Sequence, residues 1–145
     1  ICGIDIYRKA WPNAKVVAHE KEIPLLKDPG KNATKIFCGI SISVNPDIAV
    51  KDDDELELGN HIIKFLFTPG HTPGGMSVYV KGHLFSGDTL FAGSIGRTDF
   101  PGSSFKELKQ AVEKKLYTLP DNTKVYPGHM GPTTIGNEKE NNPFV

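Results

Sequence analysis

The sequence predicts a single α/β domain in which short strands are combined with helices. One observation is the run Ile62–Phe67, which is rich in β-branched and aromatic residues and is stopped by Pro69-Gly70. A second is a hairpin, in which Ser77–Val80 and His83–Ser86 flank a turn at Lys81-Gly82. A third is a capped amphipathic helix further along the chain. These patterns predict a sheet with a helix covering one face.

Composition is ordinary for one globular domain. The 145 residues, of which 38% are hydrophobic and 23% charged, suffice for a single core. Basic and acidic residues both number 17, so no overall charge favours nucleic acid or an anionic membrane as a partner. The sequence contains no run of about 18 apolar residues and no visible signal peptide. We therefore expect a cytoplasmic protein that binds neither nucleic acid nor membrane.

The first part of the chain has the pattern of a helix, a strand and a second helix. Residues Ile4–Trp11 are compatible with the end of an amphipathic helix stopped by Pro12. Lys15–Ala18 is predicted to be a short strand, and Lys21–Leu26 a helical stretch. His19 lies at the boundary between these two elements, where a lone histidine is usually a cap or a surface residue, and we assign it no metal role.

The two cysteines show no local pairing pattern. Cys2 and Cys38 have neither the spacing of a zinc ribbon nor that of a redox pair. No base lies beside Cys38 in the sequence, which favours a buried small hydrophobic residue over a reactive thiol. We expect both to be reduced thiols.

The second half of the chain predicts a long loop, a covering helix, and a final strand and helix. Thr89–Gly102 contains three glycines, one proline and no periodicity, which predicts a loop. Ser104 and Glu107 form a capping-box pattern at the start of a helix. The apolar residues that follow at helical spacing are Phe105, Leu108, Val112 and Leu116. Thr123–Tyr126 is predicted to be a strand and Thr134–Asn141 a terminal helix.

Three candidate metal ligands each follow the end of a predicted strand. They are His71, Asp88 and His129. Glycines and prolines flank His71, which suits the fixing of a side chain's direction. Imidazole and carboxylate groups on separate loops at one sheet edge suit zinc, and also iron or manganese, because these metals accept mixed nitrogen and oxygen donors. Any one of the three alone is more simply an ordinary loop residue, so the hypothesis depends on all three together.

Five motifs occur in an order that resembles the metallo-β-lactamase-fold hydrolases. They are Thr68–Gly74, Phe85–Phe91, Gly96–Gly102, Tyr126–His129 and Asn141–Phe144. The third and the last make the glyoxalase II-like (hydroxyacylglutathione hydrolase-like) branch the most similar. The resemblance runs from about His71 to the C-terminus, and the upstream part matches only in general pattern. One departure is Met130, which stands between the histidine and Gly131-Pro132 where family members commonly have Gly-Pro directly.

The resemblance implies an αββα sandwich, with two mixed sheets and helices on the outer faces. This chain would carry the second half of it and part of the first, as a single partial domain over residues 1–145. In the family, a His-x-His-x-Asp-His motif that supplies four metal ligands directly precedes a segment similar to Cys2–Asp5. That motif is absent here, so we expect an N-terminally truncated chain, which by itself would bind metal weakly.

The resemblance also implies a role for each candidate residue. His71 would bind a first metal, Asp88 would bridge two metals, and His129 would bind the second. Two zinc ions, with iron or manganese as alternatives, would activate a water for hydrolysis of a thioester or ester. Arg97 and Asp99 would pair with each other, orient a ligand, or meet an anionic substrate, and a structural loop clamp fits them as well as a substrate contact.

Two further interpretations remain open alongside the metallohydrolase. The chain is either a non-catalytic fragment or half-domain that needs a partner segment, or part of an iron-dependent persulfide dioxygenase-like oxidoreductase, since one scaffold hosts several reactions. In the hydrolase interpretation the partner is a small-molecule thioester or ester. Assembly into a homo-oligomer is open, because a sheet short of strands exposes an edge.

Overall fold

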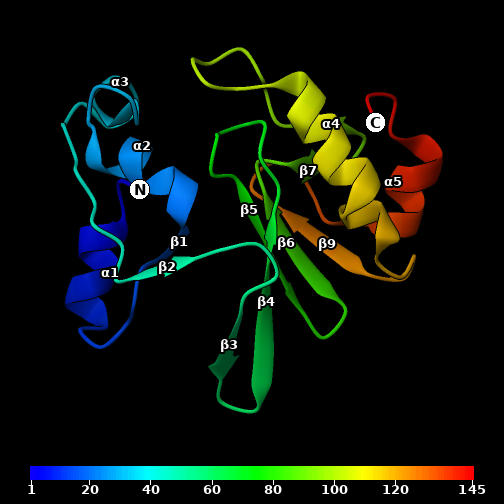
Figure 1. The fold of residues 1–145 in the computed structure, drawn as a ribbon, viewed down its shortest axis with the longest axis horizontal. Coiled ribbons are helices and arrows are strands. Elements are labelled where there is room, and N and C mark those ends of the chain that lie inside the picture. Colours follow the sequence, from blue (N-terminus) through cyan, green and yellow to red (C-terminus); the bar gives the residue numbers. More distant parts are fainter. The chain divides into compact units, whose positions relative to one another are not determined.

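The computed structural model describes all residues, 1–145, and divides them into two compact units, Ile1–Val50 and Lys51–Val145. None of its helices combines the length and the apolar character that crossing a membrane would require. The first unit, blue to cyan in Figure 1, contains short helices and one strand pair. Its elements are α1 (Ile4–Ala10), β1 (Val17–His19), η1 (Glu20–Glu22), α2 (Ile23–Lys27), α3 (Thr34–Cys38) and β2 (Ile48–Val50). Strands β1 and β2 pair in parallel.

The first unit confirms the predicted helix, strand and helix, with small shifts at their ends. The strand runs Val17–His19 instead of Lys15–Ala18. His19 is 3% exposed, and its Nδ1 accepts a hydrogen bond of 3.2 Å from the Lys21 N–H at the start of η1. The capping role is therefore confirmed, and the surface alternative is wrong. Helix α1 has no fully buried residue, but its first residue, Ile4, packs partly buried against the core cluster of Ala18, Leu26 and Val44.

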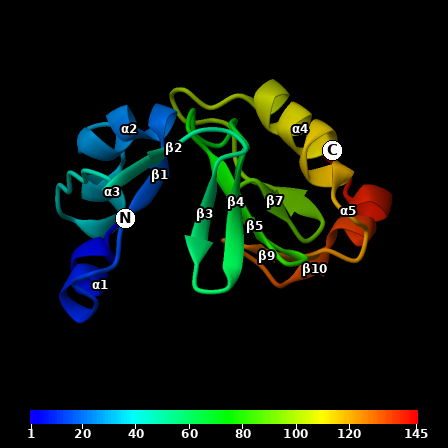
Figure 2. The ribbon, with the colours of Figure 1, turned by 60° about the horizontal axis from the view of Figure 1, so that its bottom comes forward.

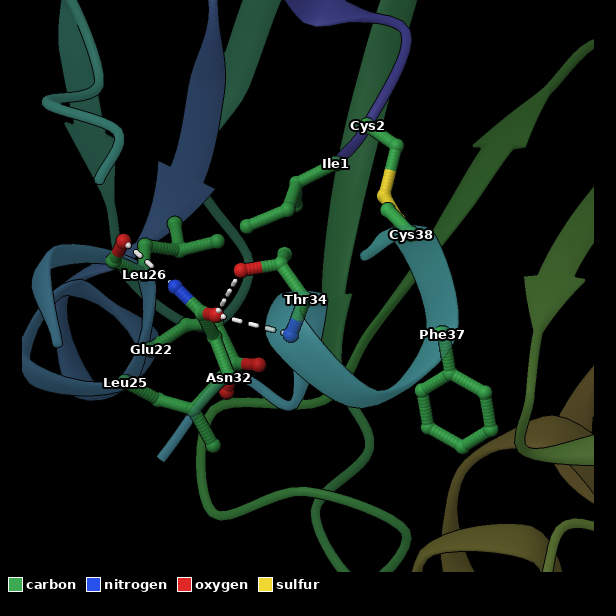
Figure 3. Close-up of a pocket in the computed structure, with 9 residues that line it drawn as sticks. All are labelled: Ile1, Cys2, Glu22, Leu25, Leu26, Asn32, Thr34, Phe37 and Cys38. Carbon is green, nitrogen blue, oxygen red and sulfur yellow. Dashed lines mark hydrogen bonds between the residues drawn. A yellow bond between two sulfur atoms is a disulfide. The ribbon is translucent and has the colours of Figure 1, made fainter. Parts of the chain in front are cut away.

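The prediction that both cysteines are reduced thiols is wrong. Cys2 and Cys38 form a disulfide, with their Cα atoms 6.6 Å apart and a separation of 36 positions in sequence. The spacing rules for zinc ribbons and redox pairs are local, whereas the fold of the unit brings this pair together. Figure 3 shows the disulfide at the rim of a pocket of about 210 Å³, whose other side holds Leu26 and Asn32.

The second unit is built on a six-stranded sheet in the order β10-β9-β6-β5-β4-β3 (Figures 1 and 2). The strands are β3 (Glu55–Leu58), β4 (His61–Phe67), β5 (Met76–Val80), β6 (His83–Gly87), β9 (Lys124–Pro127) and β10 (Thr133–Thr134). Strands β4, β5 and β6 pair antiparallel in sequence, while β6 and β9 pair in parallel. Strands β4, β6 and β9 therefore point the same way, and the segments that follow them emerge at one edge of the sheet.

Two helices cover one face of this sheet. They are α4 (Phe105–Lys114), continued by η2 (Leu116–Thr118), and α5 (Ile135–Asn141), and Figure 2 shows both on the same side. The Ser104 side chain caps α4 by accepting a hydrogen bond of 3.2 Å from the Glu107 N–H, as predicted. The core beneath combines sheet and helix residues: Leu66, Leu84, Leu90, Leu108, Val112, Leu116, Val125 and Ile135.

The prediction of an irregular loop over Thr89–Gly102 is wrong for its first half. Strands β7 (Leu90–Phe91) and β8 (Ser94–Ile95) form an antiparallel pair there, hereafter the β7–β8 hairpin. Strands of two residues are too short for a periodic pattern, so the sequence offered no signal for them. The hairpin follows directly after the Asp88 segment, which makes it part of the surroundings of the candidate ligands.

Candidate metal centre

His71, Asp88 and His129 follow three strands that run in one direction. His71 lies four residues beyond β4, Asp88 directly follows β6, and His129 lies two residues beyond β9. Because these strands are parallel to one another within the sheet, their carboxyl ends meet at the same edge. The structure therefore brings together side chains that are separated by up to 58 positions, which is 129 minus 71, in sequence.

The Asp88 carboxylate contacts both histidines. Its Oδ1 lies 2.9 Å from the Nδ1 of His129, and its Oδ2 lies 3.5 Å from the Nε2 of His71. Each oxygen thus faces a different imidazole. The Asp88 side chain is 32% exposed, so the carboxylate is sheltered by the protein but open to solvent. One carboxylate therefore lies between two imidazoles, which is an arrangement of side chains that can bind metal ions.

His71 is oriented by its other ring nitrogen. Its Nδ1 lies 2.8 Å from the carbonyl oxygen of Arg97. A carbonyl only accepts, so Nδ1 donates the hydrogen and the Nε2 is directed to Asp88. The Ser103 hydroxyl donates a hydrogen bond of 2.8 Å to the His71 main-chain carbonyl, and the Ser104 N–H donates one of 2.8 Å to Gly70. The loop that carries His71 is therefore attached to the start of α4.

His129 is the most exposed of the three, with 70% of its side chain accessible. The preceding Gly128 donates an N–H hydrogen bond of 2.8 Å to the Gly87 carbonyl, which joins the two loops. A β-carbon at Gly128 would lie 2.5 Å from Oδ1 of Asp88, so only glycine leaves the carboxylate its place. The Phe91 ring meets the His129 imidazole edge-on, with centroids 5.6 Å apart. Met130, the departure from the family pattern, has a left-handed φ of 68°.

Arg97 and Asp99 pair with each other. The Nε and Nη2 of Arg97 donate to the two carboxylate oxygens of Asp99, each at 2.6 Å. The guanidinium also lies over the Phe100 ring, 4.3 Å from its centroid. Of the three predicted alternatives the structure therefore shows the mutual ion pair, and it adds the contact of the Arg97 carbonyl to His71. Hydrogen bonding from Arg97 lowers the pKa of Asp99 to about 2.

The Asp99 carboxyl is expected to titrate with a midpoint of about 2 in the folded protein, below its ordinary 3.8. Because the folded pKa is depressed, the contribution of the pair to stability is complete above pH 3.8 and is lost as the pH falls toward 2. NMR titration of the side-chain carboxyl measures this, and Arg97→Ala should move the midpoint back toward 3.8. Lys139→Gln, which breaks a separate pair with Asp121, is the control and should leave the Asp99 midpoint unchanged.

The donor set is chemically suited to a divalent metal, although its side chains are not arranged around one. Two imidazoles and a carboxylate are the ligands that zinc and iron accept, and each lies within contact distance of the next. In their present positions, no three His, Cys, Asp or Glu side chains form a group that could hold a metal ion. Asp88 is hydrogen-bonded directly to His129, and this hydrogen bond would have to open for the two side chains to hold a metal.

Several residues around this site were not anticipated from the sequence. Phe91 contacts His129, and the Ser103 hydroxyl is bonded to the main chain of His71. Gly96 packs closely against the main chain of Asp88 and the side chain of His71. Phe91 and Gly96 each lie in one of the family motifs, which was the only signal for them in the sequence, and Ser103 lies in none. Neither Phe91 nor Ser103 is a candidate metal ligand. Their contacts with the two histidines arise only from where the fold places them.

Comparison with known proteins gives consistent results. The sequence profile of the metallo-beta-lactamase superfamily matches residues 1–129. The chain is 38% identical over 148 residues to the probable metallo-hydrolase YqgX of Bacillus subtilis (strain 168), covering 100% of this chain and 70% of that protein. It is 41% identical over 97 residues to the hydroxyacylglutathione hydrolase GloC of Haemophilus influenzae, covering 66% of this chain and 46% of that protein.

Solved structures show the same similarity. The crystal structure of the B3 metallo-beta-lactamase BLEG-1 aligns with a TM-score of 0.88 at 36% identity, over 97% of this chain and 69% of that one. TTHA1623 in a di-iron-bound form aligns with a TM-score of 0.81 at 32% identity, over 99% of this chain and 70% of that one. The chain thus spans between 46% and 70% of the length of these relatives.

Proposed function

This chain belongs to the metallo-β-lactamase superfamily, and we propose that it is part of a metal-dependent hydrolase acting on a thioester or ester, as in the glyoxalase II-like branch. The family match confirms the resemblance and the fold class predicted from the motifs. The observation that carries the proposal is Asp88, whose two oxygens each contact a histidine from a different strand end. Because the chain spans only part of its relatives, the activity is proposed for the complete protein.

We propose His71, Asp88 and His129 as metal ligands, with Asp88 shared between two metals in the complete site. Zinc fits the mixed nitrogen and oxygen donors best, and iron or manganese are alternatives, of which a di-iron-bound neighbour is an example. When bound, such metals supply an electrophile for a carbonyl oxygen and a nucleophilic water at neutral pH. Both functions are required for hydrolysis of an acyl bond.

The residues of this chain would prepare the site in three ways. Asp88 holds the two imidazoles in contact with one carboxylate. The Arg97 carbonyl accepts a hydrogen bond from Nδ1 of His71 and so keeps the proton on that nitrogen. The unprotonated Nε2 is then the nitrogen that would bind a metal. The exposed side of His129 leaves room for a substrate to approach from solvent. Arg97 is engaged by Asp99, so we assign the pair to holding this loop and not to binding substrate.

A small-molecule thioester is the proposed substrate class. One relative is named a hydroxyacylglutathione hydrolase, which is the source of this choice. The equal numbers of basic and acidic residues, 17 each, also suit a small substrate better than a nucleic acid. We further propose that both units are parts of one domain, because the family match over residues 1–129 continues across the boundary at Val50.

The test is an assay of the purified full-length protein against substrates that separate the alternatives. A hydroxyacylglutathione thioester, an oxygen ester, a β-lactam and glutathione persulfide would be compared, with bound metal measured in parallel. We expect thioester hydrolysis that is lost on chelation and restored by zinc. Oxygen consumption with the persulfide would support the iron oxidoreductase instead. Stoichiometric metal without turnover of any substrate would support a non-catalytic role.

A further inference from the structure

We propose that Glu138, a buried carboxylate on α5 outside the candidate ligand set, is a positioning residue that holds all three ligands in place through the β7–β8 hairpin. The inference rests on the proposed metal centre. It also accounts for the motif at the C-terminal end of the chain, Asn141–Phe144, which the proposed chemistry leaves without a role.

Glu138 is completely buried and fully hydrogen-bonded. Its Oε1 accepts hydrogen bonds from the Thr133 hydroxyl at 2.6 Å and the Asn137 amide at 2.8 Å. Its Oε2 accepts from the Gly93 N–H at 2.8 Å and the Asn142 amide at 2.9 Å. Burial raises the pKa of this carboxyl, but the four donors outweigh it and the pKa is lowered overall. A buried charge of this kind is stable only with such a set of donors.

The two carboxylate oxygens face different parts of the protein. The donors to Oε1 come from Thr133 and Asn137, which lie beside Glu138 at the start of α5. Oε2 instead reaches Gly93, 45 residues away, in the turn of the β7–β8 hairpin. Asn142 reinforces this link, because its amide also donates a hydrogen bond of 3.0 Å to the Ser94 carbonyl. One side of Glu138 therefore serves its own helix, and the other fastens the hairpin.

The hairpin is linked to each candidate ligand, to Asp88 and His71 through residues next to it in the chain and to His129 by a direct contact. It starts two residues after Asp88, where the Ser86 hydroxyl donates a hydrogen bond of 2.7 Å to the Leu90 carbonyl. It ends one residue before Gly96, which precedes the Arg97 carbonyl bonded to His71. Within the hairpin, the Phe91 ring packs against the His129 imidazole.

A displacement of the hairpin would consequently reach His71, Asp88 and His129 together. Glu138 and Asn142, which are bonded to each other, hold two consecutive residues of the hairpin: Glu138 binds Gly93 in its turn, and Asn142 binds Ser94 at the start of β8. The geometry points to a buried anchor that sets ligand positions without touching a metal or substrate, as outer partners of metal ligands do.

The two oxygens allow this role to be separated from a general stabilising one. Glu138→Gln removes the negative charge, so the hydrogen bonds that attach the hairpin are no longer charge-assisted and become weaker. Thr133→Val removes only an Oε1 partner and leaves the Gly93 bond intact. Glu140→Gln makes the same chemical change at an exposed position two residues along the helix and is the matched control.

The experiment has two readouts in the full-length protein. Amide hydrogen exchange and the imidazole nitrogen shifts of His71 and His129 are measured without metal, and zinc affinity is measured by chelator competition. For Glu138→Gln we expect faster exchange over residues 90–96, shifted imidazole signals, and roughly 10- to 100-fold weaker zinc binding. Thr133→Val should lower the melting temperature while leaving hairpin exchange and zinc affinity near wild type, and Glu140→Gln should change neither.

Equal effects of Glu138→Gln and Thr133→Val on the imidazole signals would overturn the proposal, as would unchanged zinc affinity in Glu138→Gln. If Glu138→Gln does not fold, Asn142→Ala replaces it, because that variant removes the Ser94 contact while keeping the charge, and it should show the same pattern. A wild-type protein that binds zinc but hydrolyses no thioester would contradict the proposed function alone, since the metal-free readouts still decide the role of Glu138.

Discussion

Replacing Asp88 with alanine is expected to reduce hydrolysis by the complete protein more than any other single substitution, with a loss of more than about 100-fold in kcat/KM. Substitution of a residue that only hydrogen-bonds to a metal ligand already lowers activity by about 10- to 100-fold, and Asp88 is itself a proposed ligand. The carboxylate contacts both histidines, so its loss removes a donor and releases two imidazoles at once. Steady-state assays with a thioester, together with metal analysis after dialysis, measure the effect. We expect lower metal content as well as lower turnover.

Two other substitutions define what this result means. Asp88→Asn keeps the shape but removes the charge, and we expect it to lose metal to nearly the same degree. His83→Ala is the control for loss of a histidine, because His83 bonds to the Lys81 carbonyl and stacks on Tyr126, without contact to the three ligands. If His83→Ala lost as much activity as Asp88→Ala, the site would be in the wrong place.

The second large effect is expected for Gly96→Ala. A β-carbon at Gly96 would overlap the main-chain carbonyl oxygen of Asp88 and lie 3.4 Å from the β-carbon of His71. Neither neighbour can move freely, because the first is backbone and the second belongs to a candidate ligand. We expect the free energy of unfolding to fall by about 1–3 kcal/mol, as for overpacking in a core, and zinc binding to weaken as well. Denaturant unfolding and chelator competition measure the two effects.

Gly131→Ala provides the matched control for this prediction. A β-carbon there would meet no atom within 4 Å, although the residue lies only two positions after His129. We expect stability and zinc affinity close to wild type. Equal losses in the two variants would mean that the site tolerates no change in its loops, and the specific clash at Gly96 would not be the cause.

Much of the site was predictable because its signals are local. A strand stopped by proline and glycine places His71 on a loop, and the same logic applies to Asp88 and His129. The hairpin at Lys81-Gly82 and the capped helix α4 were predicted for the same reason, since turn and cap residues act on their immediate neighbours.

By contrast, several features depend on contacts between distant residues. The Cys2–Cys38 disulfide and the β7–β8 hairpin left no pattern in the sequence, because the first joins residues 36 positions apart and the second has strands of only two residues. Glu138 stands in a polar stretch of the predicted terminal helix, and nothing in that stretch indicates that it is buried and bonded to Gly93.

The sequence by itself thus determined the longer strands and helices of the second unit, their ends and the identities of the candidate ligands, since each depends on residues a few positions apart. Only the tertiary structure decided that β4, β6 and β9 run in one direction, so that His71 and His129 meet on one carboxylate. It also decided that Glu138 is buried and bonded to Gly93 in the β7–β8 hairpin. Both outcomes depend on how strands and helices pack, and packing is a property of the whole unit that no local pattern encodes.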